Sequence, residues 1–352
     1  MRQFLIVLYL AASASAFAQT TAAPAAQQTI SSPVAGFWTW SVPASASSRQ
    51  LTGGLWYPAS GDFATTRLFD SSIFEGVPVQ PEAAIRPGHW PLVLISHGVG
   101  GHWRSLSWLG AGLAQQGAVV VGVNHPGSTF GDYDMRRSLN HGTRVNDLVA
   151  TLDALLSDAS IASYVDTQRI YVVGFSLGGW TALSIGGLRG DLSSYASYCA
   201  QSGHRHCRDI ARAGVDLRQL DAPTWNRSYR DTRVKAVAAI EPALHQGLNA
   251  SHASDMVDRV LLIGLGQGAD RLPDTDFSAP GTTLTSILPL ARIEVIAPAF
   301  HFSALPVCKP AGAAILAEDN DDPVCSDPSG TDRAAVHDRI TRSIGRYFGL
   351  AP

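Results

Sequence analysis

The clearest candidate for chemistry in this sequence is a serine enclosed by glycines. Residues 174–178 are Gly-Phe-Ser-Leu-Gly, and they join a strongly apolar run at 170–173 to a predicted helix at 177–188. The glycines keep Cβ atoms out of a sharp turn, and the turn presents the hydroxyl at the positive end of the helix dipole. A glycine-rich turn with an inert serine would not need this strand–turn–helix setting. The pattern therefore predicts that Ser176 is a nucleophile.

A serine nucleophile needs a base, and His301 is the candidate. It lies in the segment Ala-Phe-His-Phe-Ser at 299–303, after the strand predicted at 292–296. In proteins with this kind of serine turn, the chain order is serine, acid, histidine. A histidine between phenylalanines is elsewhere more often a packed core residue, but this position favours a base. A neutral imidazole here could accept the proton of Ser176 and pass it to a leaving group.

Two carboxylates compete for the role of the acid that orients this histidine. Asp270 follows the strand predicted at 260–265, which is the usual place for that group. Glu241 directly follows the strand predicted at 234–240 and could also reach the histidine from the sheet edge. We favour Asp270 and keep Glu241 as the alternative.

Acyl transfer also needs N–H donors for the developing oxyanion. One donor is expected on Leu177, directly after the nucleophile, and the other on the loop after an earlier strand. Residues 96–101, Ser-His-Gly-Val-Gly-Gly, follow the apolar run 92–95. We therefore predict Val99 as the second donor, through its backbone alone.

Strands and helices alternate through the region that holds these residues. Continuous apolar runs indicate strands buried on both faces, and apolar residues at helical spacing indicate the helices between them. Strands are predicted at 92–95, 118–123, 170–173, 234–240, 260–265 and 292–296, and helices at 104–116, 145–156, 177–188 and 336–348. This order predicts an α/β fold with a mostly parallel central sheet flanked by helices.

The remaining segments set the domain organisation. Residues 34–42 and 50–56 are predicted as two further strands, and 58–90 as mostly loop. Residues 189–232 are polar, contain two cysteines and interrupt the alternation, so we expect a cap-like insertion above the carboxyl edge of the sheet. One α/β-hydrolase domain is thus expected over 34–352.

The first 33 residues have a different character. Arg2, an apolar run of signal-peptide length and Ala-Phe-Ala at 16–18 predict a cleaved signal peptide over 1–18. Residues 19–33 are rich in Ala, Thr, Gln and Ser and are predicted to be a flexible leader. We expect a secreted or periplasmic protein without a transmembrane anchor, because no later apolar stretch is long enough to span a membrane.

The four cysteines are expected to form disulfides, because their number is even and export is predicted. Three pairings are possible, of which Cys199–Cys207 with Cys308–Cys325 is locally the simplest. No Cys-x-x-Cys pair is present, so a zinc site is not expected. The net charge of −3 and the lack of a basic block argue against a nucleic-acid partner.

The motifs together resemble secreted bacterial α/β-hydrolases called predicted dienelactone hydrolases, which are related to platelet-activating-factor acetylhydrolase and to some lipases and cutinases. The resemblance covers most of residues 34–349, and the matching segments are 95–101, 123–129, 173–180, 198–200, 300–302 and 306–308. It implies ester hydrolysis through Ser176, His301 and an acid. Dienelactone hydrolases proper use a cysteine nucleophile, so the dienelactone substrate is not implied. In the acetylhydrolase branch the acid follows the strand that Glu241 ends.

The sequence therefore predicts a serine carboxylic ester hydrolase that forms an acyl-enzyme on short- to medium-chain or lipid-like esters, without a cofactor. The alternatives are an amidase, peptidase or transacylase on the same residues, or a catalytically silent binding protein of the same fold. Four tryptophans could border an apolar cleft for lipid or polymer surfaces, although tryptophan is more often core: Trp103, Trp108, Trp180 and Trp225.

Overall fold

The computed structural model describes residues 34–44, 49–61, 63–278 and 284–350. The predicted signal peptide and leader lie outside these residues. Among the helices that the structure describes, none is long and apolar enough to cross a membrane.

One mixed sheet of eleven strands forms the centre of the described chain. Its order is β13-β12-β11-β10-β6-β7-β2-β1-β4-β3, and β5 pairs with β2 beside this order. The strands are β1 (Ala35–Val42), β2 (Leu51–Ser60), β3 (Thr66–Leu68), β4 (Val77–Pro81), β5 (Ala84–Ile85), β6 (Trp90–Ser96), β7 (Val119–Val123), β10 (Val165–Phe175), β11 (Val234–Ile240), β12 (Val260–Leu265) and β13 (Arg292–Ile296). The six strands from β13 to β7 are mutually parallel, whereas β2 is antiparallel to both β7 and β1.

The central parallel strands β6, β7 and β12 are almost wholly buried because helices cover both faces of the sheet, whereas the edge strand β13 is more exposed and carries Arg292 and Glu294. Along β6, Leu92 and Leu94 point into one buried cluster, and Val93 and Ile95 point into the other. This alternation follows from the two-residue period of a strand. The predicted strands are confirmed, and the bounds of β11, β12 and β13 are those expected.

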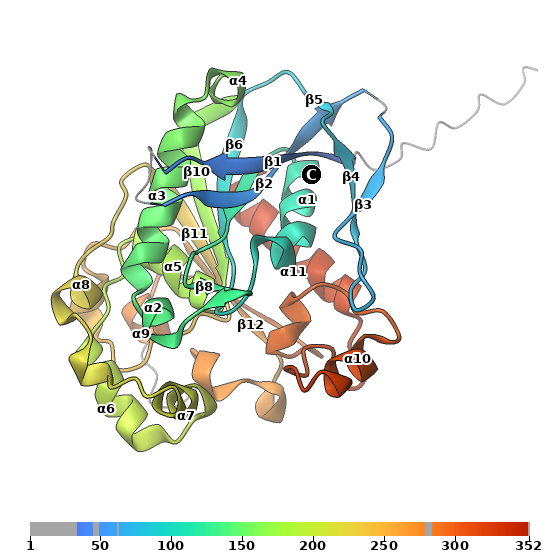
Figure 1. Ribbon diagram of the computed structural model, residues 1–352. Helices are drawn as coiled ribbons and strands as arrows, with labels where there is room; N and C mark the ends of the chain where they lie inside the picture. Colours follow the sequence, from blue (N-terminus) through green and yellow to red (C-terminus); the bar gives the residue numbers. More distant parts are fainter. Residues whose placement is uncertain (1–33, 45–48, 62, 279–283, 351–352) are drawn as a thin grey trace, which may run out of the picture. The chain divides into compact units, whose positions relative to one another are not determined.

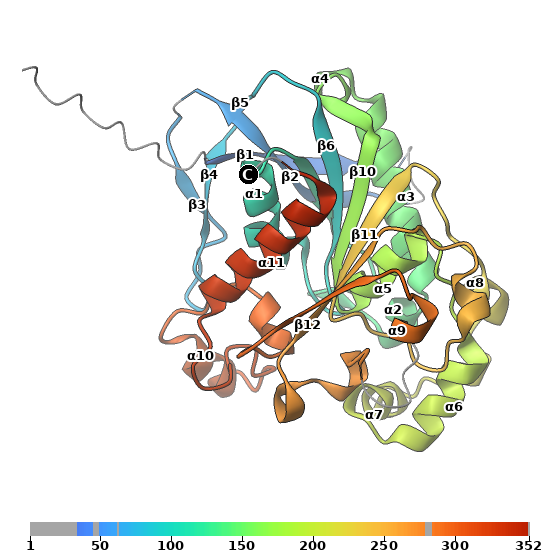
Figure 2. The ribbon, with the colours of Figure 1, turned by 180° about the vertical axis from the view of Figure 1, so that it is seen from behind.

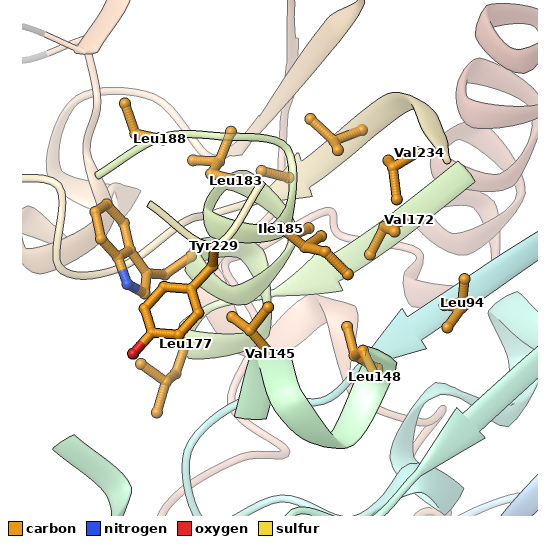
Figure 3. Close-up of a cluster of buried hydrophobic side chains, with 14 of the residues drawn as sticks. Leu94, Val145, Leu148, Val172, Leu177, Leu183, Ile185, Leu188, Tyr229 and Val234 are labelled. Atoms are coloured by element: carbon orange, nitrogen blue, oxygen red, sulfur yellow. The ribbon is translucent and has the colours of Figure 1, made fainter. Parts of the chain in front are cut away.

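Two pairs of helices cover the two faces. Helices α3 (His141–Ser157) and α5 (Leu177–Ile185) pack on one face, and α1 (Ser107–Gln115) and α11 (Arg333–Phe348) pack on the other, as Figures 1 and 2 show. Figure 3 shows the first cluster, where side chains of α3 and α5 meet those of β6, β10 and β11. The shorter elements are β8 (Ser128–Thr129), β9 (Asp132–Tyr133), α2 (Met135–Leu139), α4 (Ala159–Ala162), α6 (Leu192–Ser202), α7 (Arg205–Arg212), α8 (Ala222–Asn226), α9 (Leu284–Ile287) and α10 (Gly312–Glu318).

The segment predicted as an insertion forms α6, α7 and α8 between α5 and β11. In Figure 1, α6 and α7 lie at the lower end of the sheet, beyond the carboxyl ends of the parallel strands. The backbone N–H of His206 in α7 lies 3.5 Å from the carboxylate of Asp274, in the segment after β12. The segment 58–90, predicted as mostly loop, contains the short strands β3, β4 and β5.

The cysteines form the locally simplest of the three possible pairings. Cys199 and Cys207 join α6 to α7 across a separation of 8 residues. Cys308 and Cys325 are 17 residues apart and enclose α10. No cysteine in the described residues is free. Both disulfides thus lie in segments outside the parallel sheet.

We expect the double substitution Cys308→Ser with Cys325→Ser to lower the free energy of unfolding by about 3 kcal/mol, because it frees a closed loop in the unfolded chain. The pair Cys199→Ser with Cys207→Ser should cost slightly less, since its loop is shorter. Urea unfolding without reductant, compared with wild type, measures both. Unchanged midpoints would mean that the disulfides do not constrain the unfolded chain.

Candidate active site

Ser176 occupies the sharp turn between β10 and α5 in a strained backbone conformation. Its φ of 55° and ψ of −119° lie outside the regions that L-residues prefer. Such a conformation costs about 1–3 kcal/mol and persists only where the surroundings enforce it. Here the N–H of Ser176 donates to Ile240 O at 2.9 Å, and its carbonyl accepts from the N–H groups of Trp180 and Ala243. The strand β11 and its following loop therefore fix the serine turn.

The glycines of this turn are required by the close approach of backbone segments. A Cβ atom on Gly174 would lie 1.8 Å from the carbonyl oxygen of Gly178. A Cβ atom on Gly178 would lie 2.0 Å from the carbonyl oxygen of Ser96, at the end of β6. Any side chain at either position would displace the turn or the neighbouring strand.

His301 lies close to this turn although it comes from a distant part of the sequence. It begins the 3₁₀ helix His301–Ala304 after β13 and is almost fully buried. Its ring packs against Phe175, the residue before Ser176, with ring centroids 4.7 Å apart. The fold therefore brings the predicted base beside the predicted nucleophile, although 125 residues separate them along the chain.

Glu241 is the carboxylate that contacts this histidine. Its Oε2 lies 3.3 Å from His301 Nδ1, and its side chain is 0% exposed. Oε1 accepts the backbone N–H of Leu265 at 2.8 Å, and Oε2 accepts the Thr275 hydroxyl at 2.8 Å. The Arg271 guanidinium lies 3.5 Å from Oε1. These contacts hold the carboxylate in one orientation toward the imidazole.

The carboxylate in contact with His301 is thus Glu241, which we kept as the alternative, and not Asp270, which we favoured. Asp270 is exposed, in the 3₁₀ helix Gly268–Asp270. After β12 the chain turns through Gly266 and Gly268, both at positive φ, and this turn carries Asp270 to the surface. Glu241, in contrast, directly follows β11, the strand beside β10, so its side chain starts close to the serine turn.

The segment predicted to supply an oxyanion donor also lies at Ser176. A Cβ atom on Gly98 would be 3.3 Å from the Cβ of Ser176. Val99 follows, and Gly100 donates its N–H to Ser128 O at 3.0 Å. On the other side of the serine, Leu177 begins α5, so its N–H is one of the helix donors without an intrahelical acceptor. Of the two predicted donor residues, Leu177 thus directly follows the predicted nucleophile in the sequence, and Val99 follows Gly98, which lies beside it.

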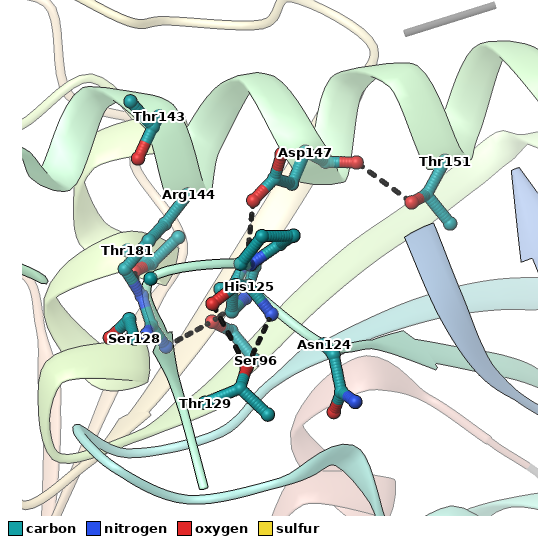
Figure 4. Close-up of polar contacts among 12 residues, drawn as sticks. Ser96, Asn124, His125, Ser128, Thr129, Thr143, Arg144, Asp147, Thr151 and Thr181 are labelled. Carbon is teal, nitrogen blue, oxygen red and sulfur yellow. Dashed lines mark hydrogen bonds and ion pairs between the residues drawn. The ribbon is translucent and has the colours of Figure 1, made fainter. Parts of the chain in front are cut away.

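A buried chain of polar side chains lies beneath this loop and was not predicted (Figure 4). Ser96 Oγ lies 2.9 Å from His125 Nε2, and His125 Nδ1 lies 3.0 Å from Asp147 Oδ2. Burial holds the pKa of His125 well below its usual range, so the ring is neutral. These residue types match a nucleophilic triad, but Ser96 is fully buried and closed to a substrate.

The sequence does contain a signal for this chain of polar groups. Arg144, Asp147 and Thr151 lie at helical spacing on the buried side of α3, interleaved with leucines. Polar groups on the buried face of a helix need internal hydrogen-bond partners. A search for polar residues at apolar-face positions would have found them.

Three of the four tryptophans that one interpretation of the sequence placed at the border of a cleft are core residues. Trp103, Trp180 and Trp225 are buried in the core clusters, and Trp108 is partly buried and stacks on His337. Exposed apolar side chains lie instead on the donor loop itself, at Val99, and on the neighbouring β8–β9 hairpin. Phe130 is 73% exposed, and its N–H donates to Gly101 O at 2.8 Å.

The parallel sheet, the strained serine turn and the buried histidine–glutamate pair define the α/β-hydrolase fold. The ferulic acid esterase from Streptomyces cinnamoneus has a similar structure, with a TM-score of 0.57 over 94% of each chain at 19% identity. The predicted fold is therefore confirmed.

Sequence comparison adds relatives for part of the chain. Residues 59–211 match the family described as PET hydrolase-like, a range that includes Val99 and Ser176. Cutinase est1 of Thermobifida alba is 31% identical over 120 residues, which are 34% of this chain and 38% of that protein. Cutinase cut1 of Thermobifida fusca is 35% identical over 104 residues, 29% of this chain and 30% of that protein. The chain thus spans less than two fifths of the length of these curated relatives.

The glycine contacts give a test of the serine turn. We expect Gly178→Ala to lower the free energy of unfolding by more than about 3 kcal/mol, or to prevent folding, because its methyl group overlaps a backbone oxygen. Gly214→Ala is the comparison variant: Gly214, unlike Gly178, has positive φ, so alanine is strained there, but no atom lies within 4 Å of the added Cβ. It should cost only about 1–2 kcal/mol. Equal losses in chemical unfolding would contradict the close approach.

Proposed function

We propose that this protein is a serine carboxylic ester hydrolase that works through an acyl-enzyme on Ser176, with His301 as base and Glu241 as acid. The observation that carries the proposal is the contact of the buried Glu241 carboxylate with His301 Nδ1, beside a serine in a strained turn. A nucleophile, a base and a group that orients the base are the three parts that acyl transfer requires.

In the first step, Ser176 Oγ attacks the ester carbonyl carbon while its proton moves to His301. Because Nδ1 faces Glu241, Nε2 is the nitrogen left to accept this proton. Glu241 fixes the tautomer of the ring and stabilises the imidazolium that forms. The carbonyl oxygen becomes an oxyanion, which accepts hydrogen bonds from the N–H groups of Val99 and Leu177.

The tetrahedral intermediate then collapses. The bond between carbon and the leaving oxygen breaks, and His301 returns the proton to that oxygen, which releases the alcohol. In the second step, a water molecule gives a proton to His301 and attacks the acyl carbon. Collapse of this second intermediate releases the carboxylic acid and restores the Ser176 hydroxyl.

We infer that the substrates are short- to medium-chain or lipid-like esters. The partial matches to proteins named cutinase, and the fold shared with a protein named ferulic acid esterase, agree with ester chemistry. Exposed Val99 and Phe130 on the loop and hairpin beside Ser176 would suit an apolar group at the entrance. We also propose export, with residues 1–18 as signal peptide, because structural disulfides are typical of exported proteins.

The first prediction from this proposal concerns the nucleophile. Ser176→Ala should lower kcat for p-nitrophenyl esters by about 10⁴- to 10⁶-fold, because the covalent route is lost. Assays over increasing acyl length, with wild type and variant at equal concentration, measure this loss and locate the chain-length optimum. Wild-type turnover of nitroanilides but not esters would favour an amidase. Wild type that turns over neither and resists fluorophosphonate labelling would be a binding protein.

The second prediction separates the two candidate acids. Glu241→Gln should lower kcat by about 10²- to 10⁴-fold, because the amide no longer stabilises the imidazolium or fixes its tautomer. Asp270→Asn, a matched change at an exposed position, should leave kcat within about twofold, as expected for surface substitutions away from the site. The reverse result would restore Asp270 as the acid.

A further inference from the structure

Arg144 is a buried cation that the proposed chemistry does not use directly. It lies in the first turns of α3 and is 1% exposed. Long charged side chains are almost never fully buried unless their donors are satisfied. The contacts of this guanidinium therefore indicate what it does.

Those contacts reach both segments that carry the oxyanion donors. On one side, Arg144 Nη2 donates to the carbonyl oxygen of His97, two residues before Val99. On the other side, Arg144 Nε donates to Thr181 Oγ1 at 3.2 Å. Thr181 in turn donates to the carbonyl oxygen of Leu177 at 2.9 Å. One planar group thus joins the loop of one donor to the first turn of the helix that holds the other.

Two further hydrogen bonds attach the same guanidinium to the support of the loop. Arg144 Nη1 donates to Ser128 Oγ at 2.7 Å, and Nη2 lies 3.3 Å from Ser96 Oγ. The carbonyl of Ser128 is also the acceptor for the N–H of Gly100. Arg144 therefore contacts β6, the donor loop, the β8–β9 hairpin and α5 at once, and Figure 4 shows it among these residues.

The charge of Arg144 is not cancelled by a direct ion pair. Its hydrogen-bond acceptors are hydroxyl and carbonyl oxygens. The nearby carboxylate of Asp147 is instead bonded by Arg49, at 2.9 Å to each oxygen, and by His125. Asp147 is thus paired with Arg49, and His125 is neutral, so no group of this cluster compensates the positive charge of Arg144. Burial lowers the pKa of Arg144 to about 9, which leaves the group protonated at neutral pH.

We propose that Arg144 is a positioning residue for the oxyanion hole: it holds the Val99 and Leu177 N–H groups in one geometry and adds positive potential at the developing oxyanion. This inference rests on the proposed function. Preorganised donors and fixed charges act strongly in a site shielded from water, because little reorganisation is needed as charge develops. The cation would then stabilise the negatively charged transition state more strongly than it stabilises the bound neutral ester.

The test compares wild type with Arg144→Gln and Arg144→Lys. We expect Arg144→Gln to lower kcat for p-nitrophenyl esters by about 10- to 100-fold, less than the outright loss of one donor. KM should change by less than about threefold, because the neutral ester gains little from the cation. Arg144→Lys keeps the charge without the planar fork and should recover part of the loss.

A trifluoromethyl ketone provides a readout that a merely structural role would not move. It forms a tetrahedral adduct with the serine oxygen and so resembles the charged intermediate. Its affinity should fall in Arg144→Gln by about the same factor as kcat/KM. The neutral alcohol product, measured as a competitive inhibitor, should bind wild type and Arg144→Gln with affinities that differ by less than about threefold.

Two buried threonines supply a matched pair if Arg144→Gln does not fold. Thr181→Val removes the hydroxyl that joins Arg144 to Leu177, and it should lower kcat by about 3- to 10-fold, as for one neutral hydrogen bond. Thr151→Val is the control: its hydroxyl is also buried and also donates to the carbonyl four residues earlier, in Asp147, but it does not touch Arg144. It should leave kcat and ketone affinity unchanged.

The outcomes separate this inference from the proposed function. If wild type hydrolyses esters but kcat and ketone affinity of Arg144→Gln or Thr181→Val stay within twofold, Arg144 is only structural and the inference is wrong. Equal loss in Thr181→Val and Thr151→Val would also overturn it. If wild type hydrolyses no ester, the proposed function fails, and this inference fails with it.

Discussion

The whole site depends on backbone segments that approach more closely than any side chain would allow. Gly178 meets the carbonyl of Ser96, and Gly174 meets the carbonyl of Gly178, so β6, β10 and the start of α5 touch along their main chains. This contact forces Ser176 into its strained turn and sets the donor loop after β6 beside it. Hydrogen bonds join this turn to Ile240 at the end of β11 and to Ala243 in the following loop, and they thereby fix the position of Glu241 beside the turn. The apolar clusters on both faces hold these strands in place.

Much of this arrangement could be predicted because its causes are local in the sequence. The alternation of strands and helices along the sequence located β11, β12 and β13 at their observed bounds, and the glycine spacing located the serine turn. The acid could not be assigned in this way, since both candidates follow a parallel strand. What decides between them is the direction of the chain after each strand: glycines at positive φ turn it outward before Asp270, whereas Glu241 lies next to the strand end. The short strands β3 to β5 carry too little apolar pattern to be recognised.

The buried polar residues of α3 show a second limit of sequence reasoning. The apolar stripe that predicted this helix also contains Arg144 and Asp147, whose partners lie on β6, the loop after β7, α5 and the β8–β9 hairpin. Partners so distant along the chain are visible only in the folded structure. An arginine in such a place is retained against a desolvation cost of several kcal/mol, which is consistent with a role beyond packing. A buried charged group therefore lies directly beside the segments that carry the proposed donors.

The disulfides bear on how the chain matures. Each cysteine is bonded to the nearest cysteine along the sequence, Cys199 to Cys207 and Cys308 to Cys325. No other cysteine lies between the two partners of either pair. When the chain emerges with its N-terminus first, the first thiol to follow Cys199 is therefore its native partner Cys207, and the first to follow Cys308 is its native partner Cys325. Simple oxidation in order of appearance yields the native connectivity, and thiol–disulfide exchange is not needed to correct it. The two disulfides can therefore form with the correct pairing before the sheet has folded. An oxidising environment without a disulfide isomerase should suffice to form them.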